Sequence, residues 1–353
     1  MNTKKVFITA GGTGGHVFPA LAVAYELINQ GYDVIWVGSF KGIENEIVPK
    51  NDIHLEKIAI SGLRKRGIVN LIKLPFILSK ALYQAYKIVR LHKPNVVISF
   101  GGYASFPVSL IAKLLNIALI IHEQNSVSGL TNRILSKLAN FVLVAYRDVF
   151  PGEKTILVGN PVRKDILQLK GVEKRYRNRS GGLKVLVLGG SLGAKVFNDN
   201  LPYVFEHLPN IESVIHQIGK REIADIQQQY DELKINAKVV SFIDNMADTY
   251  SDIDLIICRA GALTVSEICA VGLAAIFIPY PHAVDDHQKF NVLPLVADHA
   301  ALMVLQQDFT IQKMISLIKN LTRETCLKMA LQAQKHAIID SQSRIVEIAK
   351  KFL

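Results

Sequence analysis

The chain has 353 residues, half of them apolar and one fifth charged, with a formal net charge of +11 at pH 7. This composition predicts a folded globular protein, and the length suits two domains better than one core. The three cysteines, Cys258, Cys269 and Cys326, have no metal-binding or redox spacing, so a reducing cytoplasm is the simplest setting. Because the apolar runs are short or interrupted by glycine and proline, neither a signal peptide nor a membrane-spanning helix is expected.

The positive charge is concentrated in the first half of the chain. Residues 1–160 hold 18 Lys and Arg against 9 Asp and Glu, whereas residues 161–353 hold 23 against 21. Between Lys57 and His122 there are ten basic residues and no acidic ones. A surface of this kind attracts either nucleic acid or an anionic membrane.

Strand-like and helix-like segments alternate along the first half, which predicts a parallel sheet covered by helices. The predicted strands are 5–10, 33–38, 96–100, 118–122 and 141–145, and the predicted helices are 18–30, 41–49, 70–92, 105–115 and 129–138. The segment 159–163, Gly-Asn-Pro-Val-Arg, contains turn-forming residues and is the best predicted domain boundary, which gives domains 1–160 and 161–353.

The same alternation restarts after this boundary. Strands are predicted near 184–189, 213–218, 238–241, 255–258 and 275–278. The last 40 residues look helical, and we consider that the terminal helix returns to the first domain. The chain is therefore predicted to contain two similar α/β domains.

Two of the predicted strands lead directly into glycine-rich turns, at Gly11–His16 and at Gly189–Ala194. Such turns expose backbone N–H groups and a helix N-terminus to an anion, which suggests a phosphate-bearing ligand; tight packing is the alternative. A nicotinamide cofactor would need an acidic residue at the end of the second strand. Gly38-Ser39 and Gly219-Lys220 stand there instead, which argues against a dehydrogenase.

Polar residues follow other strands of the first domain at the edge where open α/β sheets bind ligands. Gly101-Gly102-Tyr103 follows one strand, and His122-Glu123-Gln124-Asn125 follows another. His16 lies at the start of a helix, whose dipole favours the neutral imidazole that can accept a proton. Solvated loops and a capping histidine are the alternatives.

The segment from Cys258 to Glu267 also has the pattern of a strand, a turn and a helix. The helix N-terminus can face a phosphate, and Glu267 can accept hydrogen bonds from two ribose hydroxyls. Alternatively, Glu267 only complements the helix dipole. In 285–288 the ionisable residues are contiguous and cannot converge on one ion, so no structural metal is expected. No cofactor is predicted either.

The stretch 64–93 combines basic and aliphatic residues. Arg64-Lys65-Arg66 precedes an apolar run that includes Ile72 and Phe76. It is either a core helix with a basic face or a surface that inserts apolar side chains into an anionic membrane. Because stacking aromatics are few, a membrane is favoured over nucleic acid.

Taken together, these motifs resemble the MurG family, the N-acetylglucosaminyltransferases of peptidoglycan synthesis. The matching motifs are Gly11–His16, Gly101–Tyr103, His122–Asn125, Gly159–Arg163, Gly189–Ser191 and Gly261–Glu267. The resemblance runs from about residue 5 to about residue 330. It implies a GT-B fold, in which two Rossmann-like domains with parallel sheets face each other across a cleft.

The resemblance also implies an activity and a location. It implies transfer of GlcNAc from UDP-GlcNAc to the C4 hydroxyl of MurNAc in lipid I, with inversion, to give lipid II. The work would take place at the cytoplasmic face of the inner membrane, with the protein bound peripherally to anionic lipid. Other cell-wall synthesis proteins are candidate partners, and nucleic acid is not.

On the acceptor side, the resemblance implies that Thr13, Gly14 and Gly15 line the donor sugar and the acceptor diphosphate. Asn125 would contact the GlcNAc, and Tyr103 belongs to the acceptor-side motifs. His16 is the first candidate for the general base that activates the acceptor hydroxyl, and Glu123 is the second.

On the donor side, Arg163 would bind the donor, Ser191 would meet a phosphate, and Ile243 would offer backbone groups to uracil. The phosphate and ribose would be held by Ala262, Leu263, Thr264, Val265, Ser266 and Glu267, with Glu267 on the ribose hydroxyls. Gln288 would contact the sugar, although the family often has two glutamines where this chain has His287-Gln288. A UDP-GlcNAc 2-epimerase and a non-catalytic nucleotide-sugar-binding scaffold are the competing functions.

Overall fold

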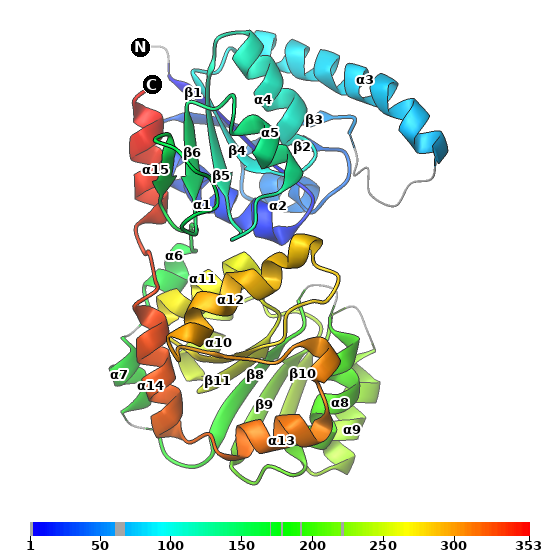
Figure 1. Ribbon diagram of the computed structural model, residues 1–353, viewed down its shortest axis with the longest axis vertical. Coiled ribbons are helices and arrows are strands. Elements are labelled where there is room, and N and C mark those ends of the chain that lie inside the picture. The colour runs from blue at the N-terminus through cyan, green and yellow to red at the C-terminus, as the bar shows by residue number, and fades with distance from the viewer. Residues whose placement is uncertain (1–2, 61–67, 170, 178, 191–192, 220–221) are drawn as a thin grey trace. The chain divides into compact units, whose positions relative to one another are not determined.

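The computed structural model describes residues 3–353 except 61–67, 170, 178, 191–192 and 220–221, and only the backbone of 68–74. The chain forms two compact units (Figure 1). Unit 1 comprises Met1–Arg163 and Ile338–Leu353, and unit 2 comprises Lys164–Ala337. In the described ranges, no helix is long and apolar enough to span a bilayer.

Unit 1 contains a seven-stranded parallel sheet in which β1 lies between β2 and β4, so that Val6 pairs with Val34 of β2 and with Val96 of β4. In sheet order the strands are β3 (His54–Ile58), β2 (Asp33–Ser39), β1 (Lys5–Ala10), β4 (Val96–Gly101), β5 (Ala118–Glu123), β6 (Phe141–Val144) and β7 (Thr155–Leu157). The helices are α1 (Gly14–Asn29), α2 (Glu44–Lys50), α3 (Ile68–His92), α4 (Ser105–Leu114), α5 (Leu130–Leu135) and α15 (Ser341–Lys350).

Alternate residues of the strands of unit 1 enter two separate cores, because successive side chains of a strand point to opposite faces. On one face, Val6 and Ile8 pack with buried residues of α1 and α15, among them Ile345. On the other face, Phe7 packs in a cluster that includes Val89 of α3 and Val108 of α4. The last helix of the chain therefore completes the core of unit 1 (Figure 1).

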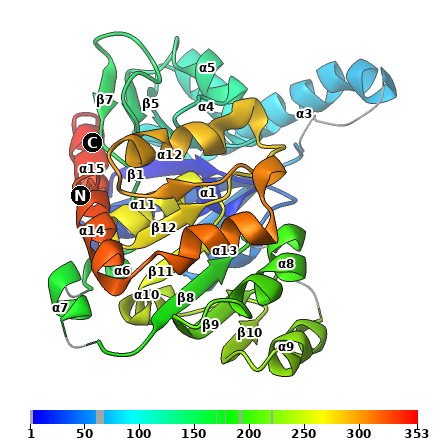
Figure 2. The same ribbon diagram turned by 60° about the horizontal axis from the view of Figure 1, so that its bottom comes forward.

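Unit 2 repeats this architecture with a six-stranded parallel sheet centred on β8 and β11 (Figure 2). In sheet order the strands are β10 (Ala237–Val240), β9 (Ile211–Gln217), β8 (Leu183–Leu188), β11 (Leu255–Cys258), β12 (Ala274–Phe277) and β13 (Leu302–Met303). The helices are α6 (Lys164–Leu167), α7 (Val172–Tyr176), α8 (Lys195–Phe205), α9 (Ile223–Glu232), α10 (Met246–Asp252), α11 (Ala262–Val271), α12 (His287–Ala297), α13 (Ile311–Lys319) and α14 (Arg323–Gln334), with 3-10 turns at Val284–Asp286 and Gln306–Asp308.

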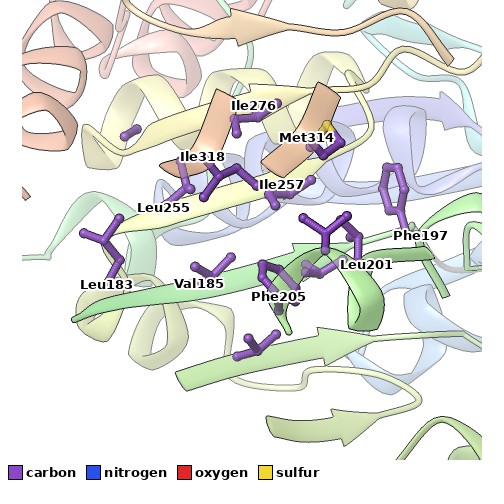
Figure 3. Close-up of a cluster of buried hydrophobic side chains, with 14 of the residues drawn as sticks. Leu183, Val185, Phe197, Leu201, Phe205, Leu255, Ile257, Ile276, Met314 and Ile318 are labelled. Carbon is purple, nitrogen blue, oxygen red and sulfur yellow. The ribbon is translucent and has the colours of Figure 1, made fainter. Parts of the chain in front are cut away.

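The main buried cluster of unit 2 lies between this sheet and helices that include α8, α13 and α14. Figure 3 shows Val185 of β8 and Ile257 of β11 packed with Phe197 of α8 and Met314 of α13. The ten predicted strands are all present, so the prediction of two parallel α/β sheets is confirmed.

Candidate functional site

The first glycine turn joins β1 to α1 and closes around a buried carboxylate. Glu44 is fully buried, and its carboxylate accepts hydrogen bonds from the backbone N–H of Gly12 at 3.0 Å and of Ser39 at 3.1 Å. A Cβ added to Gly11 would lie 2.7 Å from Oε1 of Glu44, so a larger residue there would displace this carboxylate. One N–H of this turn therefore binds the protein's own carboxylate, and sequence analysis did not single out Glu44.

The turn after β4 presses against the turn after β1. Gly102 has a φ of +91°, and a Cβ on it would lie 2.4 Å from the carbonyl oxygen of Gly11. Ser105 holds this arrangement, because its hydroxyl donates to the carbonyl oxygen of Gly101 at 2.6 Å. Tyr103, which follows, is exposed. Two of the predicted motifs thus meet at the carboxyl edge of the sheet.

His16 brings in the third motif. It lies in the first turn of α1, because the helix begins at Gly14 and not at the predicted residue 18. Its Nδ1 is 3.0 Å from Oε1 of Gln124, and its ring lies against Gly101, where a Cβ would come within 3.4 Å. His16 is half-buried, whereas Thr13 and Gly15 are exposed.

Gln124 in turn contacts His122, the histidine of β5. Nε2 of Gln124 lies 3.0 Å from the carbonyl oxygen of Phe100 and 3.0 Å from Nδ1 of His122. Nε2 of His122 lies 2.9 Å from the carbonyl oxygen of Gly159. Complete burial lowers the pKa of His122 to about 4, so this imidazole is neutral near pH 7.

Glu123 is buried, and its carboxylate holds the loop that follows β5. Oε1 accepts from the backbone N–H of Asn125 at 3.1 Å, and Oε2 accepts from Gly129 N–H at 3.1 Å and from Asn132 Nδ2 at 2.9 Å. Both oxygens are therefore engaged by the chain itself, and through them Glu123 fixes the position of Asn125.

In unit 2, the turn after β11 leads into α11, whose first residue is Ala262. The N-cap residue, Gly261, provides no side-chain hydrogen bond to the first turn. Glu267 is buried one turn further along the helix, and its Oε2 accepts from the hydroxyl of Tyr250 at 3.0 Å. Leu263 and Thr264 are half-buried, Val265 is buried, and the Ser266 hydroxyl donates to the carbonyl oxygen of Ala262 at 2.9 Å.

Gln288 lies at the start of α12 and connects that helix to the turn before α11. Its Oε1 accepts from the backbone N–H groups of Ala260 at 3.2 Å and Tyr280 at 2.9 Å. Next to it, Nδ1 of His287 contacts the carbonyl oxygen of Val284 at 2.7 Å. The amide carbonyl of Gln288 is thus used in the fold, and its position beside α11 is fixed.

The predicted uracil contact, Ile243, lies close to the second glycine turn. Its N–H donates to Oε1 of Gln217 at 3.1 Å, and Nε2 of Gln217 is 3.4 Å from the carbonyl oxygen of Gly190. Gln217 was missed in the sequence because its partners are 26 and 27 residues away. Ser191 lies outside the described residues, and Arg163 is half-buried at the end of unit 1.

Comparison with known proteins places the whole chain in one family. Residues 6–144 match the glycosyltransferase family 28 N-terminal domain, and residues 184–351 match the corresponding C-terminal domain. A Neisseria gonorrhoeae protein named UDP-N-acetylglucosamine–N-acetylmuramyl-(pentapeptide) pyrophosphoryl-undecaprenol N-acetylglucosamine transferase is 46% identical over 351 residues, which cover 99% of both chains. A Haemophilus influenzae protein of the same name is 44% identical over all of this chain and 99% of its own.

Solved structures agree with this assignment. The crystal structure of Acinetobacter baumannii MurG matches with a TM-score of 0.87 at 38% identity, over 99% of both chains. A UDP-GlcNAc 2-epimerase from Neisseria meningitidis matches with a TM-score of 0.69, but at 15% identity this likeness concerns the fold alone. It covers 99% of this chain and 100% of that one.

Proposed function

The chain belongs to glycosyltransferase family 28, and from this premise we propose that it transfers GlcNAc from UDP-GlcNAc to the muramyl sugar of lipid I. The observation that carries the proposal is the 46% identity over 99% of both chains to a transferase named for this donor and this acceptor. The predicted GT-B class agrees with two Rossmann-like units of seven and six parallel strands.

We place the donor on unit 2. The diphosphate binds at the N-terminal turn of α11, from Ala262 to Val265, since the dipole of a helix N-terminus favours anions. Within this turn the Val265 N–H is bonded to the carbonyl oxygen of Gly261. Glu267 receives the ribose hydroxyls, and Tyr250 orients its carboxylate. Gln288 faces the sugar, with its carbonyl oxygen fixed by two backbone N–H groups.

The remaining donor contacts are proposed from the family resemblance. Ile243 contacts uracil through its backbone carbonyl, because its N–H is bound by Gln217. Arg163 and Ser191 bind the donor phosphates.

We place the acceptor hydroxyl next to His16 on unit 1. Nε2 of His16 takes the proton of the C4 hydroxyl while that oxygen attacks the anomeric carbon of GlcNAc. The bond from this carbon to UDP breaks, its electron pair leaves with the diphosphate, and the configuration inverts. His16 is favoured over Glu123, because both carboxylate oxygens of Glu123 already bind the loop after β5.

Other residues of unit 1 line the same edge of the sheet. Thr13, Gly14 and Gly15 lie in the first turn of α1 or next to it, and Tyr103 is exposed beside the first glycine turn. Asn125 is positioned by Glu123. We propose that these residues contact the acceptor diphosphate and the transferred sugar.

We further propose that α3 binds the anionic cytoplasmic face of the membrane where lipid I resides. Phe76 is 77% exposed, and Tyr83 and Leu91 are exposed further along the helix. Lys87 lies 4.6 Å from the ring centroid of Tyr83, so positive charge and apolar surface are interleaved. The helix extends beyond the sheet of unit 1 in both views (Figures 1 and 2).

The activity is tested by incubating the protein with UDP-GlcNAc labelled in the sugar and a soluble lipid I analogue. We expect a labelled disaccharide that appears only when both substrates are present. Isomerised sugar without acceptor would instead identify a 2-epimerase. Donor binding without any product would identify a scaffold, and either result would overturn the proposal.

A further inference from the structure

We propose that Gln124 and His122 are positioning residues that fix the tautomer of His16, with the ring proton on Nδ1 and the lone pair on Nε2. The inference rests on the proposed function only for its consequence in catalysis. The hydrogen-bonding pattern itself is a property of the protein without substrate. Three side chains carry it, and each has one chemically possible orientation.

The amide of Gln124 can be oriented from its surroundings. One end lies 3.0 Å from the carbonyl oxygen of Phe100 and 3.3 Å from that of His122. Carbonyl oxygens only accept hydrogen bonds, so this end must be the NH₂ group. The opposite end, which faces His16, is therefore the amide oxygen.

The ring of His122 is fixed in the same way. Its Nε2 lies 2.9 Å from the carbonyl oxygen of Gly159 and must carry the proton. Burial lowers the pKa of His122 to about 4, so the ring is neutral near pH 7 and its Nδ1 carries a lone pair. This lone pair accepts the second N–H of Gln124 at 3.0 Å. Both donors of the amide are thus satisfied by buried acceptors.

The consequence for His16 follows directly. The amide oxygen of Gln124 lies 3.0 Å from Nδ1 of His16 and can only accept, so Nδ1 is protonated. In a neutral imidazole the other nitrogen is then bare. Among the described residues, none is hydrogen-bonded to Nε2 of His16. Nε2 is therefore the atom that presents a lone pair to a substrate.

The hydrogen bonds from His122 through Gln124 to His16 orient the base, and no proton is transferred between these three side chains. When Nε2 takes a proton from the acceptor hydroxyl, Nδ1–H remains bound to Gln124, so the imidazolium keeps its orientation. An amide rather than a carboxylate in this position fixes the tautomer without adding a negative charge. In serine proteases, holding the catalytic histidine in the wrong tautomer lowers kcat by about 10⁴-fold, which is an upper limit for the effect expected here.

The tautomer can be observed without turnover. Nitrogen NMR of the full chain with ¹⁵N-labelled histidine distinguishes protonated from bare ring nitrogens, and His16→Gln identifies the His16 signals. We expect a protonated Nδ1 and a bare Nε2 on His16, and the reverse on His122. A protonated Nε2 on neutral His16 in the unmodified protein would overturn the proposal, whatever the enzymatic activity.

A substitution of Gln124 tests the coupling between the residues. Gln124→Met keeps the length of the side chain but removes the acceptor, so the His16 signals should shift to a mixture of both tautomers. The mixture alone lowers kcat only by the fraction of rings in the wrong tautomer, but the variant also loses the contact that fixes the orientation of the ring. We therefore expect kcat to fall on the order of 10²-fold with the KM for UDP-GlcNAc unchanged. An unchanged His16 spectrum in this variant would show that Gln124 does not set the tautomer.

Gln227→Met is the matched control. The amide of Gln227 also connects several groups, because it accepts from Val239 N–H and donates to the carbonyl oxygen of Ala237 and to Oδ1 of Asp231, each at 3.0 Å. It lies on α9 in unit 2. We expect the His16 signals and the kcat of the Gln227→Met variant to equal those of the unmodified protein. If transfer activity is absent but His16 shows the expected tautomer, the proposed function fails and the assignment of the tautomer stands.

Discussion

At the scale of single residues, the proposed role of His16 as general base requires one ring nitrogen that the protein itself does not use. Its Nδ1 is held by Gln124, and its ring rests against Gly101, so the first turn of α1 presents Nε2 in a fixed orientation. Glu123, in contrast, has both oxygens in use for the loop after β5. The two candidate bases therefore differ in what they are able to do.

His16→Ala should lower kcat far more than it weakens binding of UDP-GlcNAc. Loss of a general base typically costs about 10²–10⁴-fold. The measurement compares kcat with a soluble lipid I analogue and the donor Kd from calorimetry. Near-normal turnover in this variant would remove His16 from the role of base.

Glu267→Gln should raise the KM for UDP-GlcNAc and leave the acceptor KM unchanged, because the carboxylate loses an acceptor for one ribose hydroxyl. A hydrogen bond to a charged group is worth about 1.5–3 kcal/mol, which corresponds to an increase of roughly 10- to 100-fold. Steady-state kinetics with each substrate varied in turn gives both constants. An unchanged donor KM would show that Glu267 does not bind the ribose.

Sequence patterns singled out residues that directly follow strands. They did not predict which side chains hydrogen-bond to those residues and fix their positions. Glycine turns and polar residues after strands identified His16 and the segment 122–125. Glu44 was missed, because nothing near it shows that its carboxylate will be enclosed by Gly11 and Gly42. The contact of Gln124 with His16 spans 108 residues, so only the fold brings the two together.

At the scale of elements, the strands that were missed all lie towards the edges of the sheets. β3 has the sequence His-Leu-Glu-Lys-Ile, which lacks the buried apolar run of a central strand. β7 and β13 have three and two residues, too short for any periodicity. Central strands are covered on both faces and show a buried apolar run in the sequence, whereas these three strands do not. The edge strand β10 was predicted, because Val239 and Val240 lie within a short apolar run.

Helix α3 is anchored at its C-terminal end and exposed further towards its start. His92 at this end hydrogen-bonds Oε1 of Glu56 on β3 at 2.8 Å, and Val89 is buried in the core. The C-terminal part of α3 therefore belongs to the core, as the core-helix interpretation predicts, whereas Phe76 is exposed. Insertion of the exposed part into a membrane stays a prediction. The basic residues 64–66 lie outside the described residues, as does the side chain of Ile72.

Replacing Ile72 and Phe76 by serine should reduce binding to anionic liposomes while sparing transfer to a soluble acceptor analogue. Each lost apolar side chain removes part of the area that can enter the bilayer, while the basic side chains remain. Liposome co-sedimentation measures the effect, with Tyr203→Ser on α8 of unit 2 as an exposed control. Equal binding of the double variant and the unmodified protein would contradict a membrane role for this face.

At the scale of the whole molecule, one architecture occurs twice, and the chain crosses between the two units a second time near its end. Unit 1 requires Ile338–Leu353 for its core, because Ile345 and Val346 are buried against α1 and the sheet. The helical character of this segment was visible in the sequence. The sequence did not show which unit this segment packs against. An amphipathic pattern indicates that one face of a helix is buried, but it does not identify the surface that covers that face.

Stability should fall as the pH falls from 7 to 5, because unit 2 contains a buried neutral histidine. His216 donates to or accepts from the Tyr230 hydroxyl at 2.9 Å, and burial lowers its pKa to about 3. Below pH 6.5 the unfolded chain takes up a proton that the folded chain does not, so unfolding is favoured until the pH reaches the folded pKa. At pH 5 this amounts to about 2 kcal/mol.

The measurement is urea unfolding at pH 7 and pH 5, followed by hydrogen exchange within unit 2. Between pH 7 and pH 5, the free energy of unfolding of the His216→Gln variant should fall by about 2 kcal/mol less than that of the unmodified protein. His207→Gln, which removes an exposed histidine of the same unit, should behave like the unmodified protein. Equal pH dependence in His216→Gln and the unmodified protein would show that this histidine is not the cause.

The most direct test of the central claim is a crystal structure of the protein with UDP-GlcNAc bound. Unit 2 should hold the donor, with the diphosphate at the start of α11 and the ribose hydroxyls within hydrogen-bonding distance of the Glu267 carboxylate. A donor bound on unit 1, or on unit 2 with its ribose away from Glu267, would contradict the account.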